Sequence, residues 1–177
     1  MNLQQTLANW DGKTAVPLEE LYNQEAASPT FIPALLPFLE AESTQGGATW
    51  LLKHYTELGN QISADSIAQI YALLPKQVGW DAKLHLLQCL PYWVVMETAV
   101  STVHFFLHNC LIEPNKFVRA WAFSGFYELA KQHPHFRTET KNLLAQASQE
   151  EAASIKARIR QIYKKDGKSS HPFLAQL

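Results

Sequence analysis

The segment Pro114–Ala130, PNKFVRAWAFSGFYELA, decides the fold of this 177-residue chain. A helix-starting Pro-Asn pair is followed by Val118-Arg119, by a small residue, and by an apolar stripe at helical spacing. This pattern is typical of a helix that packs between other helices in a stack. The segment therefore predicts a helical stack, and such stacks usually serve as binding surfaces.

The composition predicts one all-α domain over residues 1–177. Hydrophobic residues make up 47% of the chain and charged residues 18%, which excludes general disorder and allows a sizeable core. The two Asp-Gly pairs, Asp11-Gly12 and Asp166-Gly167, lie near the ends, so no β-hairpin signal separates alternating apolar runs. We therefore expect helices throughout.

The sequence contains no membrane or secretion signal that we recognise. No run of about 18 apolar residues occurs, and the N-terminus lacks a basic start followed by an apolar run. Cys89 and Cys110 both lie in apolar helical patterns, so we expect buried free thiols rather than a disulfide framework. A cytoplasmic protein with no membrane partner is the prediction.

Helical periodicity recurs along almost the whole chain. Ser63 and Asn115 are expected to lie at helix starts, Gly59 to provide a left-handed cap, and Pro37 to kink its helix. The predicted helices are 3–10, 17–26, 30–41, 47–58, 63–74, 80–90, 97–112, 115–132, 136–147 and 151–165.

Short loops group the last eight of these helices into four pairs, and the second helix of each pair carries a base at a similar place. These bases are Lys53, Lys83, Arg119 and Arg158, and successive bases are separated by 30, 36 and 39 residues. A recurrence of this length predicts a helical repeat whose units bury their apolar stripes by stacking.

The segment Val118-Arg119-Ala120-Trp121-Ala122 resembles the Val-Arg-x-x-Ala helix of HEAT and armadillo-like α-solenoids. The resemblance implies a right-handed α-α superhelix of about four hairpins over residues 29–165. Residues 1–28 would form an N-terminal helical cap and residues 166–177 a C-terminal tail. Lysine replaces arginine in the first two pairs, which departs from the family pattern. In such solenoids the second helices often line the concave face.

The resemblance favours a non-enzymatic scaffold that binds a protein or peptide on that face. Aromatic rings would supply apolar contact and the bases would supply charge complementarity. The predicted partner-binding residues are Trp50, Lys53, Trp80, Lys83, Arg119 and Arg158.

Two other interpretations of the same residues remain open. Some similar solenoids are DNA glycosylases that act on alkylated bases, so the four bases could follow phosphates while Trp50, Trp80 and Trp121 stack on nucleobases. Alternatively, each base pairs with an acid or carbonyl of the neighbouring unit, Asp81 and Glu128 being available, and fixes the register of the stack.

A zinc site is the sharpest chemical hypothesis in the sequence. His104 and His108 are one helical turn apart, and His85 and Cys89 share that spacing on the preceding helix. The four side chains could converge if these helices were antiparallel neighbours. However, the His-Glu-x-x-His and Gly-x-Ser-x-Gly motifs are absent, and histidines in helices more often simply pack or face solvent. We therefore expect no cofactor and no catalytic residue.

The net charge of −1 hides an uneven distribution. Residues 1–60 hold seven acids against two bases, whereas residues 153–177 hold six bases against one acid. This asymmetry could steer a polar partner or allow self-association. The simpler interpretation is that the basic residues complement a helix dipole in solvent.

Overall fold

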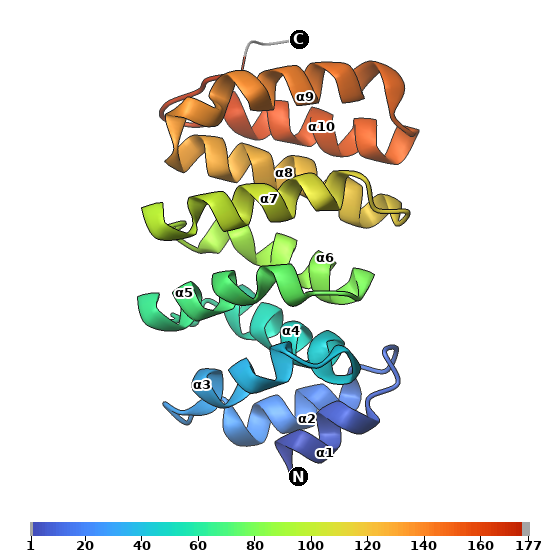
Figure 1. Cartoon of the computed structure of the whole chain (residues 1–177), viewed down its shortest axis with the longest axis vertical. Coiled ribbons are helices and arrows are strands. Elements are labelled where there is room, and N and C mark those ends of the chain that lie inside the picture. The colour runs from blue at the N-terminus through green and yellow to red at the C-terminus, as the bar shows by residue number, and fades with distance from the viewer. Residues whose placement is uncertain (1, 175–177) are drawn as a thin grey trace. The chain divides into compact units, whose positions relative to one another are not determined.

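A computed structural model describes residues 2–174 of the protein. These residues form α-helices and short 3-10 segments with no β-strand, which confirms the all-α prediction (Figure 1). Contacts group the chain into two compact units, Met1–Thr102 (unit 1) and Val103–Leu177 (unit 2), each described by itself below. The predicted domain boundaries stay a prediction. None of the described helices combines the length and the apolar character needed to cross a bilayer.

Unit 1 contains six α-helices joined by short connections. Three of them continue into 3-10 turns that begin Leu-Pro, because proline lacks the amide hydrogen that an α-helix needs. The elements are α1 (Leu3–Asn9), α2 (Val16–Glu25), α3 (Phe31–Leu35), η1 (Leu36–Leu39), α4 (Glu42–Glu57), α5 (Ala64–Leu73), η2 (Leu74–Lys76), α6 (Trp80–Cys89), η3 (Leu90–Tyr92) and η4 (Glu97–Ala99).

Unit 2 holds most of α7, whose first three residues belong to unit 1, and three further helices. Its elements are α7 (Val100–Leu111), α8 (Lys116–Gln132), η5 (Pro134–Phe136), α9 (Arg137–Glu150) and α10 (Ala153–Asp166). Helix α8 packs on both α9 and α10, which also pack on each other (Figure 1).

Local sequence signals fix many of the helix ends. The side chains of Ser63 and Asn115 accept backbone N–H groups of the first turns of α5 and α8, as predicted for N-caps. Gly59 follows α4 with φ +84°, a left-handed conformation that favours glycine. Pro37 lies where α3 gives way to the 3-10 turn η1, which confirms the predicted irregularity.

Helix α4 begins at Glu42, five residues before the predicted start at Gly47. The Gly46-Gly47 pair lies inside the helix because other side chains approach its backbone. A Cβ atom on Gly47 would come 2.8 Å from Leu7 Cδ2, and one on Gly46 would come 3.1 Å from Trp10 Cζ3. The two glycines therefore let α1 and the indole of Trp10 lie directly against α4.

The core of unit 1 is centred on α4, which packs along α6 and against η1. Gln45 is buried and links three segments: its Nε2 donates to Leu39 O at 3.2 Å and to Lys76 O at 2.8 Å, while its Oε1 accepts from Val78 N at 3.0 Å. This one amide satisfies backbone groups at the end of η1 and around the turn before α6, and so sets the register between the first two helix pairs.

The core of unit 2 surrounds α8 and includes the beginning of the C-terminal tail. Phe173 and Leu174 are buried, and the Phe173 ring stacks on Tyr127 at 5.5 Å. The buried carboxylate of Asp166 accepts the N–H of Phe173 at 3.2 Å and that of Leu174 at 2.8 Å. The tail is thus docked as far as residue 174, whereas Leu177, a further candidate for docking, lies outside the described residues.

Candidate functional site

The predicted partner-binding residues of unit 1 lie on two neighbouring helices, α4 and α6. Trp50 stacks on His54 with ring centroids 4.8 Å apart, and Lys53 Nζ forms an ion pair with Glu57 at 2.8 Å. Trp80, at the start of α6, is 52% exposed, and Lys83 is half-buried one turn later. Because α4 packs along α6, the helix that carries Trp50 and Lys53 contacts the helix that carries Trp80 and Lys83.

His85 and Cys89 lie on the side of α6 that faces α4. His85 Nδ1 is 3.1 Å from Thr49 Oγ1, and the Thr49 hydroxyl itself donates to Gln45 O at 2.7 Å. His85 Nδ1 therefore carries the hydrogen of this contact. Burial lowers the pKa of His85 to about 4, and burial raises the pKa of the Cys89 thiol above its ordinary value. Both side chains are thus neutral parts of the α4–α6 interface.

Arg119 is held by the segments around its own helix. Its Nη1 donates to Glu113 O at 2.8 Å and to Pro114 O at 3.0 Å, and its Nη2 lies 3.6 Å from Glu151 Oε2. These contacts tie the start of α8 to the loop between α9 and α10. They match the interpretation in which a base fixes the stacking register.

Glu128, a predicted partner for the bases, pairs instead with two other lysines. Its buried carboxylate lies 2.9 Å from Lys131 Nζ and 2.5 Å from Lys165 Nζ. Both ammonium groups also lie within 6 Å of the Tyr127 ring, at 5.6 Å and 5.8 Å from its centroid. This cluster joins α8 to the end of α10 and uses one of the six bases of the C-terminal region.

Arg158 and Trp121 meet across the contact between α10 and α8. The guanidinium carbon of Arg158 lies 4.0 Å from the Trp121 ring centroid, a cation–π arrangement. Both residues line a hollow of about 160 Å³ between the two helices, next to the exposed Lys116 and Phe117. No carboxylate is among the described residues that line it. Partial burial lowers the pKa of Arg158 from its usual value, because charge is less stable away from water.

His104, His108 and Glu139 form a compact cluster between α7 and the first turn of α9. Glu139 Oε1 is 3.1 Å from His104 Nε2 and 2.8 Å from His108 Nε2, and the two Nε2 atoms are 3.2 Å apart. Each side chain remains partly accessible, with 28%, 42% and 33% of its surface exposed for His104, His108 and Glu139. The two Nε2 atoms and the carboxylate therefore face one another from α7 and α9, and all three side chains remain accessible to solvent.

Aromatic packing fixes the two imidazole rings. Phe136 stacks on His104 at 4.7 Å, and the edge of Phe126 contacts His104 at 5.9 Å and His108 at 5.0 Å. Burial raises the pKa of Glu139, but hydrogen bonds from His104 and His108 outweigh it, so the carboxyl pKa lies below its ordinary value. The carboxylate is thus held in its charged form, the form that binds cations.

The structure brings together two of the four side chains in the zinc hypothesis, His104 and His108. Among residues 2–174, His104, His108 and Glu139 are the one group of three or more His, Cys, Asp or Glu side chains whose ligand atoms lie close enough to share an ion. His85 and Cys89 are not in it. The sequence does not point to Glu139 as a ligand, because Glu139 lies 31 residues beyond His108. Locally, Glu139 is simply an acidic residue in the first turn of a helix.

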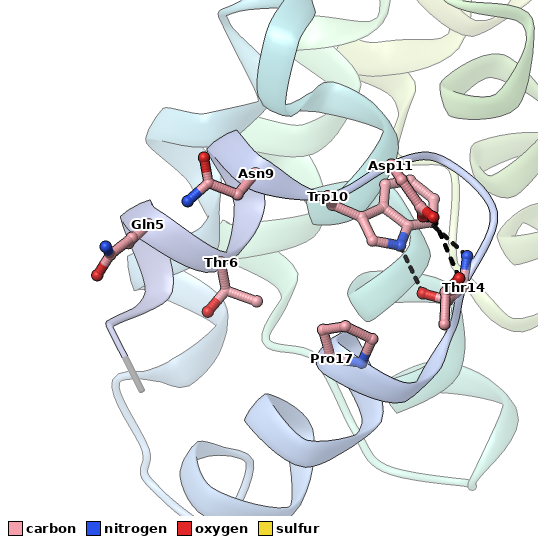
Figure 2. A pocket seen from close by; sticks show the side chains of 7 residues that line it. All are labelled: Gln5, Thr6, Asn9, Trp10, Asp11, Thr14 and Pro17. Carbon is pink, nitrogen blue, oxygen red and sulfur yellow. Dashed lines mark hydrogen bonds between the residues drawn. The ribbon is translucent and has the colours of Figure 1, made fainter.

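A second hollow, of about 490 Å³, lies between α1 and the start of α2 (Figure 2). Trp10 Nε1 donates to Thr14 O at 2.8 Å, and Asp11 Oδ1 accepts the N–H of Thr14 at 2.9 Å, so the connecting loop is closed on itself. These hydrogen bonds lower the pKa of Asp11. The polar groups of Trp10, Asp11 and Thr14 are therefore used to hold the shape of the loop.

Comparisons of the chain with protein-family models, with curated proteins and with solved structures gave no match. The function must therefore be inferred from the geometry of the chain itself.

Proposed function

We propose that this protein is a non-enzymatic scaffold that captures a protein or peptide partner on the face formed by the second helices of a short HEAT-like α-solenoid. Two packing contacts support this arrangement. In unit 1, the second helices of the first two pairs, α4 and α6, pack on each other, and in unit 2 the second helices α8 and α10 do the same. Second helices that stack on second helices are what a repeat of helical hairpins requires.

The observation that carries the function is the Arg158–Trp121 contact beside Phe117. An apolar ring that is 54% exposed, an indole and two basic groups border one hollow between stacked helices. Aromatic and arginine side chains are the residue types that contribute most to protein interfaces. Because the hollow has basic but no acidic lining residues among those described, the partner it suits is a peptide with a carboxylate next to an apolar side chain.

This proposal differs from nucleic-acid binding in how the bases are used. Lys53 and Arg119 already pair with Glu57 and Glu151, so these two bases are partly neutralised within their own units. A phosphate-tracking surface needs a row of bases available for phosphates. The arrangement therefore favours a peptide over a nucleic acid as the partner.

Selection from a random peptide display library on the purified chain tests the function. We expect enriched sequences that combine Asp or Glu with an aromatic or aliphatic residue, and weakened binding at high salt. The double variant Lys116→Glu/Arg158→Glu should bind the selected peptide at least about tenfold more weakly, which is about 1.4 kcal/mol. Arg160→Glu, which changes an exposed base of the same helix outside the hollow, is the matched control.

Charge reversal in unit 1 tests whether the second helices α4 and α6 also take part in capture. Lys53→Glu with Lys83→Glu should leave helicity by circular dichroism unchanged and abolish capture of the selected peptide. Unfolding of this double variant would favour a purely structural role for the bases. If the chain instead slowed a labelled DNA duplex in a gel at low salt, and this binding fell steeply with added salt, the partner would be a nucleic acid rather than a peptide.

A further inference from the structure

We propose that His104, His108 and Glu139 form a binding site for Zn²⁺, in which Nε2 of each histidine and one carboxylate oxygen are the protein ligands. The site is separate from the second-helix face, since its side chains come from α7 and α9. Two imidazoles and a carboxylate are a ligand set that zinc uses when three protein groups bind it and water takes the fourth position.

The distances between the three atoms match the size of a zinc coordination shell. With bonds of about 2.0–2.1 Å, neighbouring ligand atoms around tetrahedral zinc are about 3.3 Å apart. The triangle formed by His104 Nε2, His108 Nε2 and Glu139 Oε1 has sides of 3.2, 3.1 and 2.8 Å. Seating an ion needs only a slight widening at the carboxylate, which rotation of the Glu139 side chain can supply.

The surroundings of the cluster suit a preformed site. The spacing of four residues places both imidazoles on one side of α7, and the rings are held by Phe126 and Phe136 through the stacked and edge contacts described above. Glu139 contributes one negative charge, which offsets half of the charge of a divalent cation, while the two imidazoles bind as neutral ligands. The exposed fractions of 28–42% leave a path for the ion and room for a bound water.

Binding would replace hydrogen bonds with metal bonds and change the tautomer of both imidazoles. Without an ion, each Nε2 lies within hydrogen-bonding distance of the Glu139 carboxylate and donates an N–H to it. Zinc binds a lone pair on Nε2, so the hydrogen of each neutral ring moves through solvent from Nε2 to Nδ1 and no net proton is lost. Protons compete with zinc for the imidazole nitrogens, so affinity should fall as the solution becomes more acidic. Mg²⁺, which prefers all-oxygen ligands, should compete poorly.

Titration of the full chain with ZnCl₂, after treatment with a chelator and its removal, tests the site. Calorimetry should show saturable binding of one zinc ion per chain. Titration with Co²⁺ should give the intense visible absorption of a four-coordinate ion, and zinc should displace it. MgCl₂ should leave the Co²⁺ spectrum unchanged.

Matched variants separate this site from incidental binding by surface histidines. His108→Gln and Glu139→Gln should each weaken zinc binding by at least about tenfold, since even loss of an outer-shell partner costs that much. His171→Gln and Glu150→Gln, which change exposed residues outside the cluster and its aromatic supports, should bind zinc as the original chain does. Circular dichroism establishes that each variant is folded.

Three results would overturn the zinc site. The first is absence of saturable zinc binding by the folded chain. The second is zinc binding that persists undiminished in His108→Gln and Glu139→Gln. The third is equal weakening of zinc binding by His171→Gln. Because the readout is metal binding and not peptide capture, failure here leaves the proposed scaffold function intact, and failure of peptide capture leaves the zinc site intact.

Discussion

Acidification should destabilise unit 1 through a single side chain, His85. The ring is partly buried between α4 and α6, and its pKa is lowered from 6.5 to about 4, chiefly by desolvation. Among the charged groups that act on it, Asp81 and Glu57 raise the pKa and Lys53 lowers it. The neutral ring is therefore the form that the folded state prefers.

The sign and size of the effect follow from proton linkage. An unfolded chain protonates this imidazole near pH 6.5, whereas the folded chain does so only near pH 4, so the unfolded state binds more protons between these values. The stabilisation of the folded state by the neutral His85 ring is fully present above pH 6.5, declines as the pH falls from 6.5 to 4, and is lost by about pH 4. The lowered pKa corresponds to at most about 3 kcal/mol, and the part of the ring that solvent reaches reduces this to about 1–3 kcal/mol.

Urea unfolding at a series of pH values between 7 and 4 measures this contribution. Unit 1 holds Trp10, Trp50, Trp80 and Trp93, so a Trp121→Phe background makes indole fluorescence report on unit 1 alone. In that background, His85→Gln should retain a hydrogen bond to Thr49 and lose stability more slowly with falling pH than the parent.

The other histidine of unit 1 provides the control. His54→Gln removes an imidazole that stacks on Trp50 and has no part in the His85–Thr49 contact, so it shows whether loss of any histidine from unit 1 changes the pH profile. If the parent and His85→Gln lose stability in parallel below pH 6.5, desolvation of His85 is not the cause and the reasoning is refuted.

Three further substitutions test the local devices that shape the two units. Asp166→Ala should release the tail at Phe173 and cost about 2–4 kcal/mol in urea unfolding followed by circular dichroism, because two buried N–H groups lose their acceptor. Asn115→Ala should cost about 1 kcal/mol in the same assay, and Asn115→Ser should restore most of it. Gly59→Ala should lower the free energy of unfolding of unit 1 by about 1–2 kcal/mol, since its φ of +84° strains any residue with a Cβ atom. A lower thermal midpoint would report this loss.

The start of α4 and the Glu139 cluster show where sequence reasoning reached its limit. Gly46 and Gly47 have poor intrinsic helix propensity, so the sequence alone favours a helix that begins after them. Close approach of Leu7 and Trp10, which come from a segment almost forty residues earlier, accounts for the glycines inside the helix. In the same way, the spacing of His104 and His108 predicts two imidazoles on one helix side, but no spacing in the sequence points to Glu139.

The sequence by itself determined the helical class, most helix ends and the residues that cap them, since these depend on hydrogen bonds and steric limits within a few positions of the chain. Ser63, Asn115 and Gly59 are examples. Only the tertiary structure decided which side chains meet: Arg158 with Trp121, His85 with Thr49, and His104 and His108 with Glu139. Those encounters depend on how each helix is rotated and packed against helices far away in the sequence, and periodicity specifies the apolar side of a helix without naming its neighbour.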